Sequence, residues 1–280
     1  MSNRRRLDVV MVERALAPSR EQAQALIAAG RVTVGGAPAE RPGRLVAAGE
    51  PVSLAGPPPR FVGRGAEKLD AALDRFGVDV EGRRALDAGA STGGFTDCLL
   101  QRGAALVVAL DVGRGQLHER LRADPRVVSR EQCNLRWARL ADLGGVPFPV
   151  VVADLSFISL RTVAAVLLLD LAAPGADVIV LVKPQFEAGR AEVSRGRGVV
   201  RDPAAWRRSL AGVVRASERC GAAMMGVMAS PLTGAGGNVE FLLHCRPGVP
   251  APSPGLDLDK AVGEGLAMAG ASGGANRGSA

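Results

Sequence analysis

The stretch LDAGASTGGF, residues 86–95, decides the fold. It lies between an apolar run that predicts a strand and a run that predicts a helix, which is where α/β proteins place ligand-binding turns. Its glycines allow the backbone to come close to a ligand, and free N–H groups at a helix start favour an anionic group. The spacing is neither the dinucleotide-binding G-x-G-x-x-G nor the Walker A motif, which requires G-K-[ST]. We therefore expect a ligand site of another kind at this turn.

Strands and helices are predicted to alternate from about residue 83 onward. Apolar runs typical of strands cover residues 85–87, 106–111, 150–154, 178–183, 224–229 and 239–245. Helical patterns cover residues 95–102, 160–171 and 203–220. Near-continuous apolar strands separated by helices are typical of a parallel sheet. The predicted fold class is therefore α/β, a Rossmann-like sheet with helices on both faces.

The first part of the chain is predicted to be a separate, small α+β module. A capping box at Ser19 begins a helix, and residues 31–38 have the pattern of a strand, a glycine turn and a return strand. Prolines at 57–59 mark a stiff linker. The expected boundaries are 1–58 for this module, 59–67 for the linker, 68–246 for the Rossmann-like domain and 247–280 for a flexible C-terminal tail.

The tail is rich in Pro, Gly, Ala and Ser, a composition that buries little apolar surface. The sequence permits a short helix over residues 260–268, and the last dozen residues are expected to be disordered.

The net charge and the cysteine count limit which kinds of partner and bound metal are expected. The formal net charge is +7 and the pI about 10.2, which suits nucleic acid or an anionic membrane. Four scattered cysteines and two histidines suit neither a zinc site nor a disulfide framework. No signal peptide is evident, and the longest apolar run, 163–173, contains Asp170 and is too short to cross a bilayer. We expect a cytoplasmic protein without a metal or a membrane partner.

Lysine is rare in this basic chain. Of the 35 basic residues, only Lys68, Lys183 and Lys260 are lysines. Arginine serves a generic basic surface equally well, but only lysine loses its proton readily when it is desolvated or lies beside another cation. Lys68 and Lys183 are therefore candidates for chemistry, whereas we expect none from Lys260 in the tail.

The glycine-rich turn resembles motif I of the Rossmann-like methyltransferases. That resemblance implies S-adenosylmethionine as the cofactor, with its methionine carboxylate on the turn. Asp111 closes the next strand, where an acid should hold ribose hydroxyls, and Asn134 is a candidate contact to adenine. The expected cofactor-binding residues are Asp87, Gly89, Ser91, Thr92, Gly93, Gly94, Phe95, Asp111, Asn134 and Asp154.

Acids and lysines follow several of the predicted strands. Asp154 ends the run 150–154, and Lys183 ends the run 178–183. The carboxyl ends of strands in an open α/β sheet face the ligand crevice, so these two side chains should lie together. Lys68 follows the linker, and Glu240 lies in the sequence GNVEF at 237–241.

At this level of detail the chain resembles the TlyA family of ribosomal RNA ribose 2′-O-methyltransferases, relatives of the FtsJ-type enzymes. The matching stretches are residues 62–69, 87–98, 153–160, 181–187 and 230–241. The resemblance implies a Lys-Asp-Lys-Glu tetrad, here Lys68, Asp154, Lys183 and Glu240. It also implies an αL-type RNA-binding domain over residues 1–58. The implied substrates are cytidine riboses in 16S rRNA, 23S rRNA or both, in assembled ribosomal subunits.

The tetrad has a chemical rationale. A ribose hydroxyl is a poor nucleophile until its proton is removed or loosened. A lysine can take that proton if burial or a nearby cation lowers its pKa. Lys183 is our candidate base, Lys68 the nearby cation, and Asp154 and Glu240 the carboxylates that hold the two ammonium groups. The sequence does not determine which of the four tetrad residues finally takes the proton.

Arginines are expected to hold the RNA. The segment 184–201 is predicted to be a flexible arginine loop beside the crevice that contacts phosphate. Phe157 is a candidate to stack on the target nucleotide. The expected RNA-binding residues are Arg4, Arg6, Arg20, Arg31, Arg64, Arg190, Arg195 and Arg197.

Three alternatives stay open. In a base N-methyltransferase the DLSF sequence at 154–157 would stand for Asp/Asn-Pro-Pro-Tyr/Phe, although both prolines are missing. A non-catalytic ribosome-assembly protein would leave the intact turn and the tetrad unexplained. A membrane-acting cytolysin, a label attached to this family, lacks an amphipathic stripe to support it. The oligomeric state is open.

Overall fold

The computed structural model describes residues 4–17, 19–56, 60–250 and 255–274. The chain forms two compact units, Met1–Arg60 and Phe61–Ala280. The described residues include no helix with the length and hydropathy needed to span a bilayer.

The N-terminal unit packs two helices on short strands. Its elements are β1 Arg5–Arg6, α1 Leu7–Glu13, α2 Arg20–Ala28, β2 Val32–Val34, β3 Ala37–Pro38, β4 Leu45–Val46 and β5 Val52–Leu54. Leu7, Met11 and Ile27 from the helices are buried with Val32 and Val34 of β2 in one small core. Ser19 caps α2 by accepting a hydrogen bond from the Gln22 backbone N–H, as the sequence predicts.

The second unit is built on a seven-stranded sheet. The strands are β6 Arg84–Ala88, β7 Leu106–Leu110, β8 Val127–Arg130, β9 Phe148–Ala153, β10 Ala172–Val182, β11 Ala222–Ala229 and β12 Phe241–Pro247. Their order in the sheet is β11-β12-β10-β9-β6-β7-β8. The sequence order reverses on either side of the β9–β6 pair, and ligands bind at the strand ends near such a reversal.

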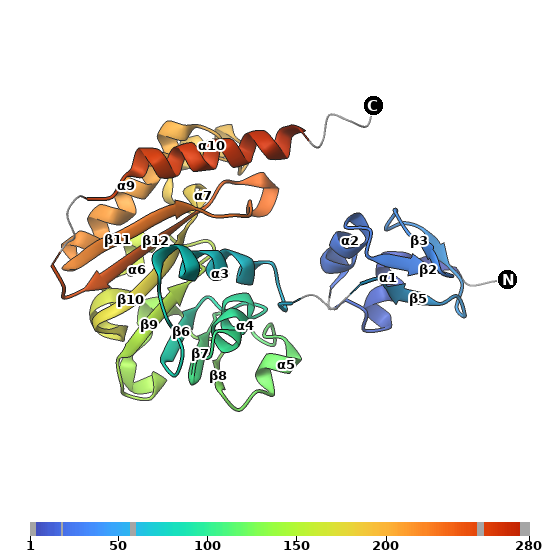
Figure 1. The fold of residues 1–280 in the computed structure, drawn as a ribbon, viewed down its shortest axis with the longest axis horizontal. Helices are drawn as coiled ribbons and strands as arrows, with labels where there is room; N and C mark the ends of the chain where they lie inside the picture. Colours follow the sequence, from blue (N-terminus) through green and yellow to red (C-terminus); the bar gives the residue numbers. More distant parts are fainter. Residues whose placement is uncertain (1–3, 18, 57–59, 251–254, 275–280) are drawn as a thin grey trace. The chain divides into compact units, whose positions relative to one another are not determined.

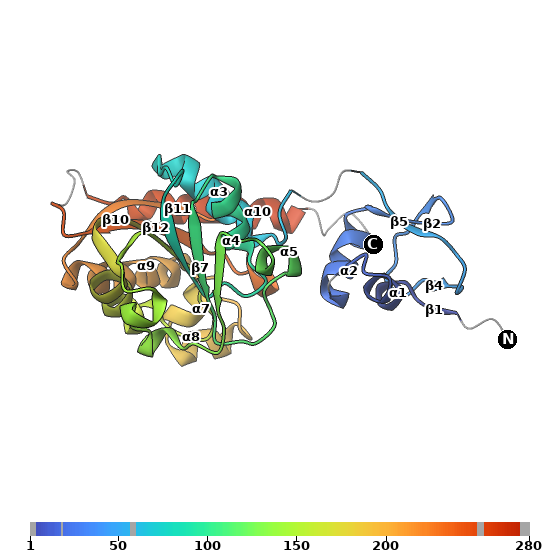
Figure 2. The same cartoon turned by 90° about the horizontal axis from the view of Figure 1, so that it is seen from below.

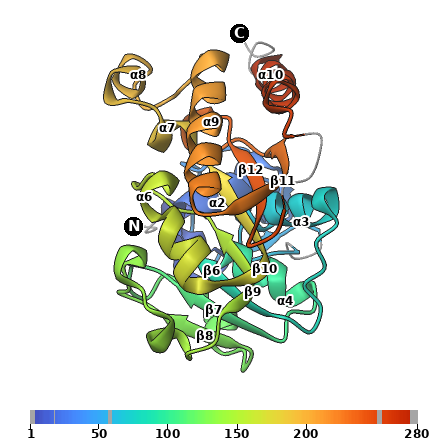
Figure 3. The same ribbon diagram turned by 90° about the vertical axis from the view of Figure 1, so that its left-hand side faces the viewer.

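Helices cover both faces of this sheet (Figures 1 and 3). The helices are α3 Gly65–Phe76, α4 Gly94–Gln101, α5 Glu119–Arg122, α6 Leu160–Ala165, α7 Pro184–Glu187, α8 Arg190–Arg195, α9 Pro203–Arg219 and α10 Leu258–Gly274. Side chains of α3 and α4 share one core with alternate strand residues such as Val150 and Val152. Side chains of α6, α9 and α10 share the other core with Val151 and Ala153. This arrangement confirms the predicted α/β fold with a helical layer on each face.

The sheet is not wholly parallel, which corrects the sequence-based expectation. β12 runs antiparallel to both β10 and β11, and Val182 at the end of β10 pairs with Phe241 at the start of β12. Residues just before β12 therefore lie at the carboxyl edge of the parallel strands. Glu240 lies at this edge for this reason, whereas a parallel β12 would have placed it at the opposite edge.

The C-terminal segment differs from the expected flexible tail, and the short helix that the sequence permits over residues 260–268 is present as part of a longer one. Residues Leu258–Gly274 form α10, which packs beside α9 and β11 (Figures 1 and 2). Ala261 and Val262 are buried in the larger core, and Glu264 accepts a hydrogen bond from the Ala229 backbone N–H. Part of the expected disorder, residues 275–280, lies outside the described residues.

Candidate active site

The glycine-rich turn joins β6 to α4, as the sequence predicts. Gly89 has φ +86°, and a Cβ there would lie 2.6 Å from the Asp154 carbonyl oxygen. Gly93 has φ +96°, and a Cβ there would lie 2.3 Å from a Leu121 methyl carbon. Both positions thus require glycine for backbone conformation and for space. The turn is packed tightly from below, and Ser91 and Thr92 at its tip are exposed.

Asp87 lies beneath the turn and is fully buried. Its Oδ2 accepts a 2.6 Å hydrogen bond from the Thr96 hydroxyl, whereas its Oδ1 has no hydrogen-bond partner among the described residues. Burial, with the nearby charges of Asp154 and Asp111, raises the pKa of Asp87 to about 7 although the Thr96 hydrogen bond opposes the shift. A buried carboxyl oxygen without a partner is suited to a cationic group of a ligand.

Asp111 follows β7 and faces the same turn. Its carboxylate accepts hydrogen bonds from the backbone N–H groups of Ser91, at 2.8 Å, and Gly113, at 2.7 Å. The acid is thereby fixed at the strand end beside residues 89–93. Asn134 is exposed, and its side chain accepts a hydrogen bond from the Arg136 backbone N–H, capping the 3₁₀ turn Leu135–Trp137.

Lys183 and Asp154 form an ion pair at adjacent strand ends. Lys183 Nζ lies 2.6 Å from Asp154 Oδ1 and 3.2 Å from Ser156 Oγ. β9 and β10 are parallel neighbours, so their ends bring the two residues together. The contact of Gly89 with the Asp154 backbone places this pair directly beside the turn.

Lys68 and Glu240 form a second, more deeply buried ion pair. Lys68 Nζ on α3 lies 2.6 Å from Glu240 Oε2, and the two residues are 8% and 2% exposed. Gln185 Nε2 donates to Glu240 Oε1 at 3.3 Å. Because Gln185 lies two residues after Lys183, it connects the second pair to the first.

The start of α3 also lies at this site. A Cβ at Gly65 would lie 3.9 Å from Asp154 Oδ2 and from the Phe95 ring. A Cβ at Gly94 would lie 3.1 Å from the Ala66 backbone nitrogen. The helix that carries Lys68 therefore begins against both the glycine-rich turn and Asp154. Phe95 itself is buried in the core beneath the turn.

Two further residues organise this edge, and neither was singled out from the sequence. Gln185 is the link described above. Asn238 accepts a hydrogen bond from the Val200 backbone N–H and donates to the carbonyls of Gly198 and Ala235. It thus fixes the loop that leads into Glu240. The only sequence signals were their places in the segments 181–187 and 230–241.

The arginines expected to contact RNA differ in environment. Arg6 and Arg20 both bind the buried Asp8, and these contacts outweigh burial to hold the Asp8 pKa well below its usual range. Arg31 donates to the Ala55 carbonyl. Arg4, Arg64, Arg195 and Arg197 are exposed, and no side-chain placement is described for Arg190.

The segment 184–201 is not the irregular, flexible loop that the sequence predicts. It contains the short helices α7 and α8, and only its remainder is irregular. Proline at the first position of α7 suits a helix start, and the Ala188 backbone N–H bonds back to the Pro184 carbonyl. The arginine-rich segment is therefore partly preorganised beside Lys183.

Phe157 is exposed in the loop that follows Asp154. Its side chain is 92% exposed, and its φ of +64° lies in the left-handed region, which disfavours residues with a side chain. Its ring lies 5.4 Å from that of Phe186, between centroids. Lys183 Nζ lies 5.9 Å from the centre of the Phe186 ring. An aromatic face is thus presented next to the Lys183–Asp154 pair.

Comparison with known proteins matches both units to family models. The FtsJ-like methyltransferase model matches residues 61–246, and the S4 domain model matches residues 5–52.

Individual relatives that match most of the chain agree with these family matches. The 16S/23S rRNA (cytidine-2′-O)-methyltransferase TlyA of Mycobacterium tuberculosis is 50% identical over 247 residues, covering 88% of this chain and 91% of that protein. The 23S rRNA (cytidine-2′-O)-methyltransferase TlyA of Campylobacter jejuni is 33% identical, covering 66% of this chain and 70% of that protein. A solved structure from Streptococcus thermophilus, described as a hemolysin, has a TM-score of 0.78 and 36% identity, covering 98% and 100% of the two chains.

Proposed function

Because this chain belongs to the TlyA family of FtsJ-like methyltransferases, we propose that it methylates cytidine 2′-hydroxyls of ribosomal RNA, with S-adenosylmethionine as donor. The observation that carries the proposal is the meeting of two lysine–carboxylate pairs beside the glycine-rich turn. A base N-methyltransferase has no evident use for two crevice lysines. The names of the matched relatives support the same substrate class.

The residues of the turn fit S-adenosylmethionine. The unpartnered Oδ1 of Asp87 suits the ammonium of the methionine moiety, and the exposed tip of the turn offers the Thr92 backbone N–H to the carboxylate. Asp111, fixed at the end of β7, suits the ribose hydroxyls. When bound, the cofactor supplies an electrophilic methyl group on a sulfonium centre.

The four residues of the tetrad then have separate roles in the removal of the hydroxyl proton. Lys183 first releases its ammonium proton to water; its neutral Nζ then accepts the proton of the ribose hydroxyl as the oxygen attacks, and Asp154 stabilises the ammonium that forms again. Lys68 supplies a fixed positive charge that favours the developing alkoxide. Glu240, held by Lys68 and Gln185, keeps that charge in position. Ser156 Oγ accepts a hydrogen bond from Lys183 Nζ and helps to hold it in place.

RNA contacts come from both units. The S4 domain and the exposed arginines Arg64, Arg195 and Arg197 contact backbone phosphate, which positions the substrate without reading its sequence. Phe157 stacks on the target base, which must leave its helix to bring the ribose to Lys183. The strained, exposed backbone at Phe157 supports this role, because such strain is concentrated at functional sites.

The experiment is methyl transfer to intact ribosomal subunits. Unmodified 30S and 50S subunits are incubated separately with the protein and labelled S-adenosylmethionine, and the modified nucleoside is identified after digestion. We expect 2′-O-methylcytidine. Both subunits should be tested, since the relative with the higher coverage is named for 16S and 23S rRNA and the other for 23S alone. Label on a base, or none on either subunit, would refute the proposal.

A further inference from the structure

Glu187 is a buried carboxylate just outside the tetrad, at the end of α7. Its side chain is 1% exposed. Glu187 Oε1 accepts a 2.6 Å hydrogen bond from the Leu160 backbone N–H. Glu187 Oε2 accepts hydrogen bonds from Ser159 Oγ, at 2.6 Å, and Arg161 Nε, at 3.1 Å. A buried carboxylate with three donors is costly to disturb, because removing it leaves those donors unpaired.

These contacts join the two loops that carry Asp154 and Lys183. Ser159, Leu160 and Arg161 form the start of α6, which directly follows the Asp154 loop. Glu187 lies one turn after Lys183, and Phe186 N–H bonds back to the Lys183 carbonyl, so α7 transmits its position to Lys183. A second bond, from Arg161 Nη2 to the Glu187 carbonyl at 2.9 Å, adds to the attachment.

We propose that Glu187 is a positioning residue that fixes Lys183 against Asp154. The ion pair at 2.6 Å requires the two strand-end loops to keep their relative placement. Glu187 supplies a charged, buried attachment between them. Its effect on catalysis rests on the proposed function, whereas its effect on the placement of Lys183 does not.

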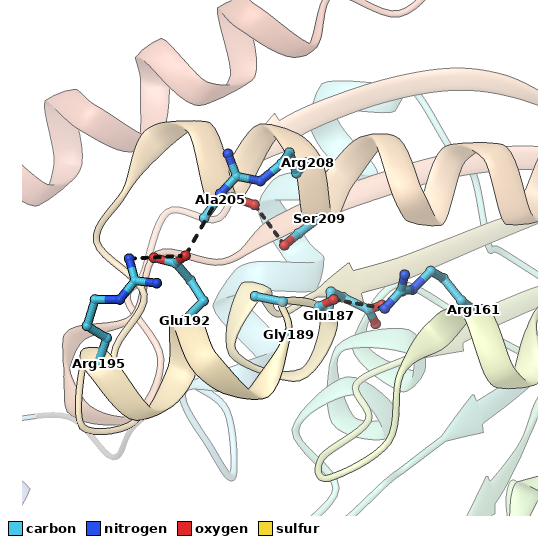
Figure 4. A pocket seen from close by; sticks show the side chains of 9 residues that line it. Arg161, Glu187, Gly189, Glu192, Arg195, Ala205, Arg208 and Ser209 are labelled. Carbon is cyan, nitrogen blue, oxygen red and sulfur yellow. Dashed lines mark hydrogen bonds and ion pairs between the residues drawn. The ribbon is translucent and has the colours of Figure 1, made fainter.

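The space around Glu187 allows its side chain to be shortened without unfolding the protein. It lines a cavity of about 300 Å³ together with Arg161, Glu192, Arg195, Arg208 and Ser209. Figure 4 shows the contact of Arg161 with Glu187, separate from the contacts that Glu192 makes with Arg195 and Arg208. Water can enter such a polar space when the side chain is shortened, so Glu187→Ala should still fold.

Asp177 provides a matched control. It is also a buried carboxylate, 4% exposed, and it accepts hydrogen bonds from Arg83, at 2.8 Å, and Arg246, at 2.7 Å, besides contacting His244. It lies on β10, the strand that leads to Lys183, but at the opposite end of the parallel strands. Asp177→Asn should therefore destabilise the fold without disturbing the tetrad.

The test observes Lys183 directly. The chain has three lysines, so selective ¹³C,¹⁵N-lysine labelling gives three side-chain NMR signals, assigned with Lys183→Ala and Lys260→Ala. In Glu187→Ala we expect the Lys183 signal to shift or broaden while that of Lys260 stays unchanged. Glu187→Gln should give a smaller change, because its carbonyl oxygen can still accept from Leu160. Asp177→Asn should leave the Lys183 signal in place.

The same variants are assayed for methyl transfer. For Glu187→Ala we expect kcat per bound S-adenosylmethionine to fall on the order of 10- to 100-fold, as for a catalytic group displaced by about 1 Å. KM for the subunits should stay within about twofold, since Glu187 touches no substrate. An unmoved Lys183 signal in Glu187→Ala, or an equal shift in Asp177→Asn, overturns the inference. If the Lys183 signal moves in Glu187→Ala but the wild-type protein methylates no RNA, only the proposed function is refuted.

Discussion

Lys68 Nζ lies 2.6 Å from Glu240 Oε2, although 172 residues separate the two in the chain. The pair forms because α3 packs against the turn after β6, and because β12 runs antiparallel and begins at the carboxyl edge of the sheet. Both side chains are almost fully buried. This contact joins the first helix of the second unit to the residue that precedes its last strand.

Variants of the Lys68–Glu240 pair should separate its effect on stability from its effect on activity. Lys68→Met leaves Glu240 buried without its partner, so we expect a loss of about 3–5 kcal/mol in the free energy of unfolding. Lys68→Met/Glu240→Gln removes both charges and should recover most of that loss, measured by urea denaturation. Neither variant should transfer methyl groups. A double variant with wild-type kcat would show that the pair is only structural.

Gly89→Ala should weaken cofactor binding by displacing the glycine-rich turn. The new Cβ would lie 2.6 Å from the Asp154 carbonyl oxygen, a backbone atom that cannot move aside cheaply. Gly77→Ala is the control, since Gly77 also has positive φ but has nothing within 4 Å of the new Cβ. Both variants pay about 1–2 kcal/mol for the left-handed backbone. Calorimetry should show more than a tenfold loss of S-adenosylmethionine affinity in Gly89→Ala only.

Asp87 should make cofactor affinity depend on pH. Burial raises its pKa to about 7, so the carboxyl is neutral below that pH and ionised above it. An ammonium group binds the ionised form better, so affinity for S-adenosylmethionine should rise as pH increases from 5.5 to 7.5. Folded Asp87 keeps its proton up to about pH 7, whereas the unfolded carboxyl releases it near its ordinary pKa of 3.8. The free energy of unfolding should therefore be highest below pH 3.8 and fall as pH rises from there through 7. In Asp87→Asn both dependences should flatten, as followed by calorimetry and thermal unfolding.

Phe157→Ala should weaken RNA binding while cofactor binding is unchanged. The side chain is 92% exposed, so its removal costs the fold little, whereas a stacked base is worth about 1–3 kcal/mol. We expect KM for the subunits to rise about 5- to 100-fold. Leu169→Ala, which removes another exposed apolar side chain at 60% exposure, serves as the control. An unchanged KM in Phe157→Ala would remove this residue from the RNA surface.

The sequence predicts the turn and the strand-end residues well, for physical reasons. Gly89 and Gly93 stand where a side chain cannot fit, so the motif records a local constraint. Asp154 and Lys183 end adjacent parallel strands, and strand ends are visible as the last polar residue after an apolar run.

Strand direction and tertiary packing were not predictable in the same way. A central strand buried on both faces has the same apolar pattern in either direction, so the sequence pattern does not reveal that β12 is antiparallel. The segment Leu258–Gly274 has a Gly- and Ala-rich composition typical of a linker, and its helix is stabilised by the burial of Ala261 and Val262. Gln185 and Asn238 act through contacts with residues distant in the sequence, which no local pattern reveals.

The most direct test of the account compares Lys183→Ala with Lys260→Ala on unmodified ribosomal subunits. Methylated nucleotides are mapped at single-residue resolution, and cofactor binding is measured for each variant in parallel. We predict 2′-O-methylcytidine with wild type and Lys260→Ala, and none with Lys183→Ala, although all three bind S-adenosylmethionine. Transfer by Lys183→Ala at near wild-type rate, or a methyl group on a base, would contradict it.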